Sequence, residues 1–127
     1  MSDILLDTDI LIDLLKNYPP AFNWMATIRH LSIGITAVNW LEVMQGANSK
    51  LEQRSALRFL TQFEIHHLHS DDSTWTIQQF PTAYLVHGVG MLDVFTGAIA
   101  VRLQLPIYTR NVKHFSRLPG VLAITPY

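Results

Sequence analysis

The sequence contains no cysteine, and this absence excludes disulfides, thiolate metal ligands and cysteine nucleophiles. It is typical of a protein in the reducing cytoplasm. Charged residues make up 15% of the chain against roughly 25% in an average protein, so part of the surface is expected to be apolar and to meet a partner. The formal net charge is −1, which argues against a broad nucleic-acid-binding surface and leaves phosphate binding to a few Arg or Lys residues or to a metal ion.

Long apolar runs are also missing. None approaches the roughly 18 residues that a transmembrane helix needs, so we expect no contact with a membrane. The N-terminal stretch carries Asp3, Asp7 and Asp9 and lacks basic residues, which argues against a signal peptide. A chain of 127 residues is expected to form one domain, spanning 1–127, with a sizeable core.

Apolar stretches typical of strands alternate with stretches of helical periodicity. This order predicts an α/β fold with a central, mostly parallel sheet flanked by helices. The expected strands are 4–6, 31–35, 64–68, 106–109 and 121–124, and the expected helices are 8–17, 21–29, 37–45, 51–63, 70–80, 91–103 and a short 111–115. Pro81, Gly88 and Gly90 argue against a continuous helix over 82–90.

The chain opens with a short apolar strand, 4–6, that stops at Asp7. A helical pattern follows at once, with Thr8 suited to the N-cap and Asp9 in the first turn, where the helix dipole favours a negative charge. The C-terminal ends of parallel strands are where open α/β sheets place their chemistry, so Asp7 is a candidate functional residue. The competing interpretation is that Asp7 only helps to cap the helix.

Two further acids stand alone in apolar surroundings. Glu42 is the only Asp, Glu, Lys or Arg between Arg29 and Lys50, and Asp93 is the only one between Asp72 and Arg102. A lone buried carboxylate is costly unless it is paired, neutralised or bound to a cation. A distant Arg that folds back onto one acid would satisfy this requirement, but three acids at matching positions favour convergence on one site.

Three carboxylates at one edge of a sheet would repel one another and raise each other's pKa. A hard divalent cation removes that conflict, and Mg²⁺ or Mn²⁺ prefers ligands that are all oxygen. The chemistry implied is attack of water on a phosphodiester, assisted by the metal. His66, His67 and His69 invite a zinc site, but strand alternation would place His66 and His67 on opposite faces.

Four stretches together resemble the PIN-domain family, and are most similar to the VapC-type toxins of toxin–antitoxin pairs. They are Leu6–Ile12 with Asp7, Ile35–Val43 with Thr36 and Glu42, Leu92–Ala100 with Asp93, Ala98 and Ala100, and Tyr108–Phe115. They span nearly the whole chain in the family's order. The resemblance implies a PIN-like three-layer sandwich and a metal-dependent endoribonuclease, usually a homodimer, that a small antitoxin encoded beside it holds inactive.

Carried over to this chain, the resemblance makes Asp7, Glu42 and Asp93 the acids that bind Mg²⁺, with Mn²⁺ as its substitute. The family often has a fourth acid in the last stretch, where this sequence offers only Asn111 and His114. Asn111 is the better candidate because Mg²⁺ favours oxygen, and one strong metal site is the expectation.

Residues around this last stretch are candidates for contact with the substrate. Arg110 and Lys113 are expected to hold RNA phosphates near the metal, and their competing role is that of ordinary solvated charges. Thr109 either hydrogen-bonds a ligand or simply ends its strand.

Two other functions remain open from the sequence. Asp7-Thr8-Asp9 would suit an aspartyl-nucleophile phosphatase, in which Asp7 attacks phosphorus and Asp9 is the general acid. Asp9→Asn should be nearly silent in a nuclease and severe in that phosphatase. The second alternative is a non-catalytic module that binds RNA or a protein and has lost turnover together with the fourth acid.

Overall fold

A computed structural model describes all of residues 1–127. At its centre is a five-stranded sheet in the order β3-β2-β1-β4-β5, in which all neighbouring strands are parallel. The strands are β1 (Ile4–Leu6), β2 (Ile33–Thr36), β3 (Glu64–His66), β4 (Ile107–Tyr108) and β5 (Ala123–Ile124). The α/β class and the central parallel sheet expected from the sequence are therefore confirmed.

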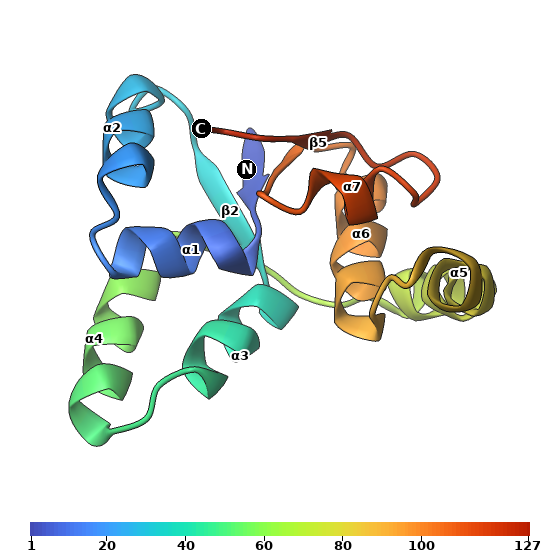
Figure 1. Cartoon of the computed structure of the whole chain (residues 1–127), viewed down its shortest axis with the longest axis horizontal. Helices are drawn as coiled ribbons and strands as arrows, with labels where there is room; N and C mark the ends of the chain where they lie inside the picture. The colour runs from blue at the N-terminus through green and yellow to red at the C-terminus, as the bar shows by residue number, and fades with distance from the viewer.

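Helices cover both faces of this sheet, which gives the expected three layers. Figure 1 shows α1, α2 and α4 on one side and α5, α6 and α7 on the other. The helices are α1 (Thr8–Leu15), α2 (Pro19–Thr27), α3 (Ala37–Gln45), α4 (Lys50–Leu60), α5 (Ser70–His87), α6 (Met91–Leu103) and α7 (Val112–Phe115). None of them is both long enough and apolar enough to cross a membrane.

The central strand β1 is buried on both faces, as its uninterrupted apolar sequence requires. Successive side chains of a strand point to opposite faces. Ile4 and Leu6 accordingly pack into the core beneath α1 to α4, while Leu5 packs with Ile107 into the second core, on the side of α5 to α7. This double burial places the carboxyl end of β1 in the middle of the molecule.

The chain runs outward from β1 in two opposite directions. It first adds β2 and β3 on one side, and later adds β4 and β5 on the other. Strand order therefore reverses between β1 and β4, and in open α/β sheets the crevice at such a reversal is where ligands bind. Asp7 follows β1 and Thr109 follows β4, so both residues lie at this point.

Helix α5 differs from the expectation drawn from its proline. The sequence suggested that Pro81 ends the helix, but α5 continues to His87 and ends at Gly88, whose φ of 69° is the left-handed conformation typical of a helix C-cap. Pro81 lacks the N–H that would bond to the turn before it. It lies on an exposed part of α5, where water can bond the carbonyl that is left free.

An ion pair between the half-buried Arg102 and the buried Asp72 ties the start of α5 to the end of α6. Asp72, which is 1% exposed, accepts hydrogen bonds from Arg102 Nε at 2.9 Å and from an Arg102 terminal nitrogen at 3.0 Å. The same carboxylate accepts the backbone N–H of His69 at 2.8 Å, so it also closes the N-terminus of α5. Removing one member of such a pair leaves the other charge without a partner.

Asp72→Ala should therefore lower the free energy of unfolding by about 3 kcal/mol, measured by urea denaturation. Asp71→Ala is the matched control, because Asp71 is exposed on the same turn and makes no ion pair. We expect the control to change stability by no more than about 0.5 kcal/mol. Equal losses in the two variants would contradict this role for the Asp72–Arg102 pair.

Candidate metal-binding site

Asp7 joins the end of β1 to the start of α1. Its backbone N–H donates to the carbonyl of Tyr108 at 3.0 Å, which continues the pairing of β1 with β4 by one residue. Asp7, and not Thr8 as the sequence suggested, is the N-cap residue of α1, but its side chain makes no capping hydrogen bond. The carboxylate instead accepts a hydrogen bond from the Thr109 hydroxyl at 2.8 Å. The interpretation of Asp7 as a mere cap therefore does not describe its side chain.

Glu42 reaches the same region from α3. Thr36 caps this helix, as expected, by accepting the backbone N–H of Asn39 at 3.1 Å. Glu42 lies on the second turn, and its carboxylate accepts a hydrogen bond from the Thr8 hydroxyl at 2.7 Å. Thr8 is the first residue of α1, so this bond links the carboxyl ends of β1 and β2 through their following helices.

Asp93 enters from the first turn of α6 and is half-buried. The Asn111 side-chain amide donates to Asp93 at 3.5 Å and lies 3.0 Å from His114 Nδ1. The backbone N–H of Asn111 donates to the Thr109 hydroxyl at 2.9 Å. The last motif is therefore held against both Asp93 and the end of β4, and Asn111 lies beside Asp93.

Asp9 belongs to the same group of acids, although the sequence favoured a plain first-turn role. One carboxylate oxygen accepts the backbone N–H of Arg110 at 2.9 Å, and the other, Oδ1, is buried without a hydrogen-bond partner. The signal in the sequence was the spacing Asp7-Thr8-Asp9. Because Asp9 shares the site, Asp9→Asn would alter the charge of a nuclease site too, and it does not separate nuclease from phosphatase as cleanly as expected.

We call Asp7, Asp9, Glu42 and Asp93 the acidic cluster. Burial, more than mutual repulsion, raises the pKa of three of its members, Asp7, Asp9 and Asp93. Burial raises the pKa of Asp7 from an ordinary value of 3.8 to about 7, with further contributions from the charges of Asp9 and Asp93. Burial and the charge of Glu42 raise the pKa of Asp93. Burial also raises the pKa of Asp9. The four carboxylates therefore lie close enough together to affect one another.

No lysine or arginine side chain forms an ion pair with any member of the acidic cluster. The arginine of the last motif, Arg110, forms its ion pair with a residue outside the cluster. Its Nε lies 3.0 Å from Asp13 Oδ2 and a terminal nitrogen donates to Asp13 Oδ1 at 3.2 Å, while the Tyr127 hydroxyl donates to the same carboxylate at 2.6 Å. The possibility that a distant arginine neutralises one of the acids is therefore not realised.

The donor chemistry of the acidic cluster fits a hard divalent cation. The donor atoms that it offers are all carboxylate oxygens, it has excess negative charge, and Oδ1 of Asp9 is buried without a partner. The positions of the side chains, however, do not form a ready metal site. No three His, Asp or Glu side chains in the chain are arranged to hold one metal ion. Each of the three predicted ligands accepts a hydrogen bond from a neutral side chain: Asp7 from Thr109, Glu42 from Thr8 and Asp93 from Asn111.

The remaining predicted residues take different positions. Thr109 is fully buried and its hydroxyl donates to Asp7, so it supports that carboxylate and does not face a substrate. Lys113 is exposed and unpaired, and Arg110 is exposed beside Asp13. The sequence analysis missed Asn39, whose amide nitrogen donates to Asp7 at 3.3 Å and to Thr8 at 3.0 Å. Its spacing of three residues from Glu42, on one helix face, was the available signal.

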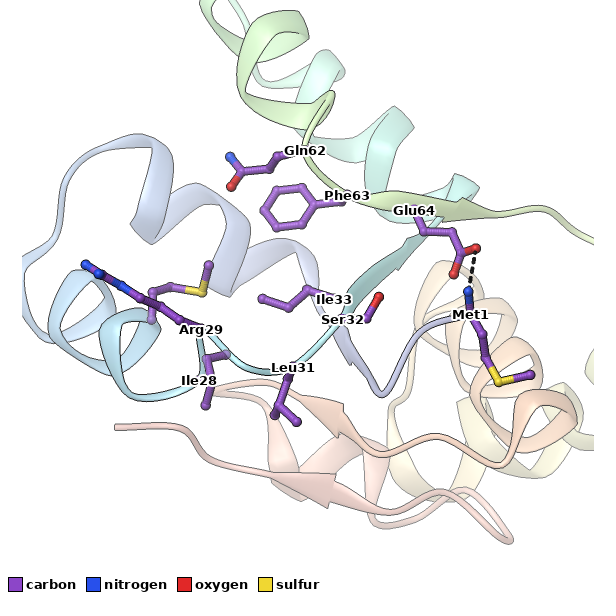
Figure 2. Close-up of a pocket in the computed structure, with 10 residues that line it drawn as sticks. Met1, Ile28, Arg29, Leu31, Ser32, Ile33, Gln62, Phe63 and Glu64 are labelled. Carbon is purple, nitrogen blue, oxygen red and sulfur yellow. Dashed lines mark hydrogen bonds and ion pairs between the residues drawn. The ribbon is translucent and has the colours of Figure 1, made fainter.

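A separate pocket of about 440 Å³ lies at the opposite end of the strands. Figure 2 shows its lining, with Glu64 turned toward the amino group of Met1. It is lined by both hydrophobic and polar residues, which lie around the beginnings of β2 and β3 and near the end of α2. It contains a single acid, so the acidic cluster remains the better candidate for chemistry.

No protein-family model and no curated protein matches the sequence. Solved structures do match. The chain resembles one in a toxin–antitoxin complex from Klebsiella pneumoniae with 27% identity and a TM-score of 0.79, covering 98% of both chains. It resembles DNA-bound VapBC from Salmonella typhimurium with 22% identity and a TM-score of 0.82, covering 100% of both. The chain has a PIN-like fold.

A third structure, VapBC-1 from nontypeable Haemophilus influenzae, matches with 20% identity and a TM-score of 0.80 over 97% of both chains. The resemblance to VapC-type PIN-domain proteins, drawn from four short motifs, is thus confirmed at the level of the fold. In this PIN-like fold the four motifs meet at the carboxyl edge of the sheet, around Asp7.

The raised pKa of Asp7 predicts how stability depends on pH. Between an ordinary pKa of 3.8 and the folded value of about 7, the folded chain keeps a proton that the unfolded chain releases. Stability therefore falls as the pH rises through this window and stays low above it. With a chelator present, Asp7→Asn should raise the free energy of unfolding at pH 8 by about 2 kcal/mol and change it little at pH 4.

Urea denaturation at several pH values measures this effect, with Asp71→Asn as an exposed control. A wild-type protein and an Asp7→Asn variant whose stabilities follow parallel curves from pH 4 to pH 8 would contradict the assignment of the raised pKa to Asp7.

Proposed function

We propose that this chain is the toxin of a toxin–antitoxin pair and that it is an endoribonuclease dependent on Mg²⁺. One observation carries the proposal: the acidic cluster gathers at the carboxyl edge of a parallel sheet, and no basic side chain pairs with it. The PIN-like fold, shared with a chain of a toxin–antitoxin complex, supports the same function. Hydrolysis would add water across a P–O bond of RNA, leaving a phosphate on one fragment and a hydroxyl on the other.

Asp7, Glu42 and Asp93 would hold Mg²⁺, or Mn²⁺ in its place, with Asn111 beside them. When bound, such an ion lowers the pKa of water and stabilises negative charge on phosphoryl oxygens. The chain's own contribution is to bring carboxylates from three elements to one place. Thr109 orients Asp7, Thr8 orients Glu42 and Asn111 orients Asp93. Excess negative charge makes the cluster receptive to a cation and unreceptive to a phosphate alone.

Arg110 and Lys113 are the proposed contacts with RNA phosphates. A guanidinium has five N–H donors, and Asp13 takes only the edge formed by Nε and one terminal nitrogen. The opposite edge stays free, and the side chain is half-exposed next to Asp9. Asp13 thus fixes the guanidinium in place while leaving donors for a phosphate. Lys113 adds a mobile positive charge on the same loop.

The proposed partners are a small cognate antitoxin and a second copy of the chain. Low overall charge and several exposed apolar side chains on α5 and at the start of α6 support binding to other proteins. These side chains are Ile77, Tyr84, Leu85, Val86, Met91 and Leu92. Co-expression with the neighbouring small gene, scored by growth arrest and RNA cleavage, tests the toxin role directly.

Asp7→Asn should abolish RNA cleavage in Mg²⁺ with little loss of fold. Loss of a metal-binding acid should cost more than the 10–100-fold typical of loss of a residue that only supports a ligand, so we expect kcat to fall by more than about 100-fold. The measurement is cleavage of a labelled single-stranded RNA by protein free of wild-type contamination. Circular dichroism checks the fold.

Asp71→Asn is the matched control and should cleave at the normal rate, since Asp71 is exposed on α5. Normal cleavage by Asp7→Asn would refute the mechanism. A wild-type protein that binds RNA but cuts none in Mg²⁺ or Mn²⁺ would instead favour the non-catalytic binding module.

Arg110→Ala should weaken RNA binding and leave the chemical step nearly intact. Loss of a hydrogen bond to a charged group is worth about 1.5–3 kcal/mol, so KM should rise by about tenfold or more while kcat changes little. Arg54→Ala is the control, because Arg54 is exposed on α4. If both variants raise KM equally, Arg110 has no special contact with RNA.

A further inference from the structure

Asn39 is a fully buried amide on α3, one turn before Glu42. Its side-chain oxygen accepts two hydrogen bonds from Thr36, one from the backbone N–H at 3.2 Å and one from the hydroxyl at 2.8 Å. Its nitrogen donates to Asp7 Oδ1 at 3.3 Å and to the Thr8 hydroxyl at 3.0 Å. Every hydrogen-bonding position of this amide is therefore used.

These partners allow only one orientation of the amide. If it were reversed, its oxygen would face the carboxylate of Asp7 and its NH₂ group would face the backbone N–H of Thr36, so both contacts would be repulsive. This orientation of Asn39 also fixes the direction of the hydrogen bond between Thr8 and Glu42. Because the Thr8 oxygen accepts from Asn39, its single proton is directed to Glu42, at 2.7 Å.

We propose that Asn39 is a positioning residue for the metal ligands, which holds Asp7 directly and Glu42 through Thr8. This inference rests on the proposed function of the site. The two acids come from different places in the chain: Asp7 follows β1, and Glu42 lies on α3. From its place on α3, the amide of Asn39 donates to Asp7 and to Thr8 at the start of α1, so it ties α3 to the end of β1 at this edge.

Capping of α3 alone does not explain this arrangement. The cap uses only the side-chain oxygen of Asn39 and its backbone N–H, both of which contact Thr36. The amide nitrogen plays no part in the cap and is aimed at Asp7 and Thr8. Thr8, in turn, makes no cap of its own, because Asp7 is the N-cap residue of α1. Replacing Asn39 therefore disturbs the cap of α3 as well as the links to the acids, whereas replacing Thr8 disturbs no helix cap.

The test is the affinity for Mn²⁺ alone, measured by calorimetric titration of the purified full chain. Asn39→Leu keeps the side-chain volume and removes both links to the acids. Thr8→Val keeps the shape and the Asn39–Asp7 bond, and it breaks the link that runs from Asn39 through Thr8 to Glu42. Residues that support metal ligands typically contribute 10–100-fold to affinity, so Asn39→Leu should raise the Kd for Mn²⁺ by at least about tenfold, and Thr8→Val by a smaller factor.

Ser49→Ala is the matched control for loss of a helix cap. Ser49 caps α4 by accepting the N–H of Glu52, and it lies outside the acidic cluster. This variant should lose stability in urea and yet bind Mn²⁺ as the wild type does. A role of Asn39 in stability alone would make Asn39→Leu behave in the same way, with a lower unfolding midpoint and an unchanged Kd.

The outcomes separate this inference from the function on which it rests. If wild-type protein binds Mn²⁺ and cleaves RNA while both folded variants bind Mn²⁺ as tightly, the role of Asn39 is refuted and the nuclease stands. If Asn39→Leu does not fold, the Kd of Thr8→Val for Mn²⁺ decides between the outcomes, because this variant disturbs no helix cap. Wild-type protein without affinity for Mn²⁺ would overturn the proposed function and this inference together.

Discussion

The central constraint in this molecule is the burial of like charges at the carboxyl edge of its sheet. The members of the acidic cluster share a region where burial raises the pKa of Asp7 to about 7, and no Lys or Arg side chain forms an ion pair with them. Such an arrangement costs stability, because charged groups lose hydration and repel one another. Binding of a divalent cation, as proposed above, would offset this cost.

A set of neutral polar groups makes the arrangement tolerable. Thr109, Thr8 and Asn111 each hold one acid, and Asn39 joins two of them. These groups come from the ends of strands and the starts of helices, so the topology of the parallel sheet brings them together. The same hydrogen bonds determine where each carboxylate points. The network that orients these carboxylates thus contains no charged donor side chain.

Much of the fold could be predicted because local patterns agreed with the tertiary structure. The apolar stretch of β1, the cap at Thr36 and the alternation of strands with helices all led to the correct class. The prediction failed at Pro81, where a strong local rule met an exposed helix surface on which water replaces the missing partner. It also failed at Thr8, whose hydroxyl bonds Glu42 while Asp7 takes the cap position.

The sequence by itself determined which acids would be isolated, since the absence of Lys and Arg around Glu42 and Asp93 is a matter of composition alone. It also placed Asp7 at the end of a buried strand. Only the tertiary structure decided that Asp9 joins the cluster, that Arg110 pairs with Asp13, and that Asn39 bridges Asp7 and Thr8. These contacts join residues about 30 to 100 positions apart, and no local pattern encodes such distances.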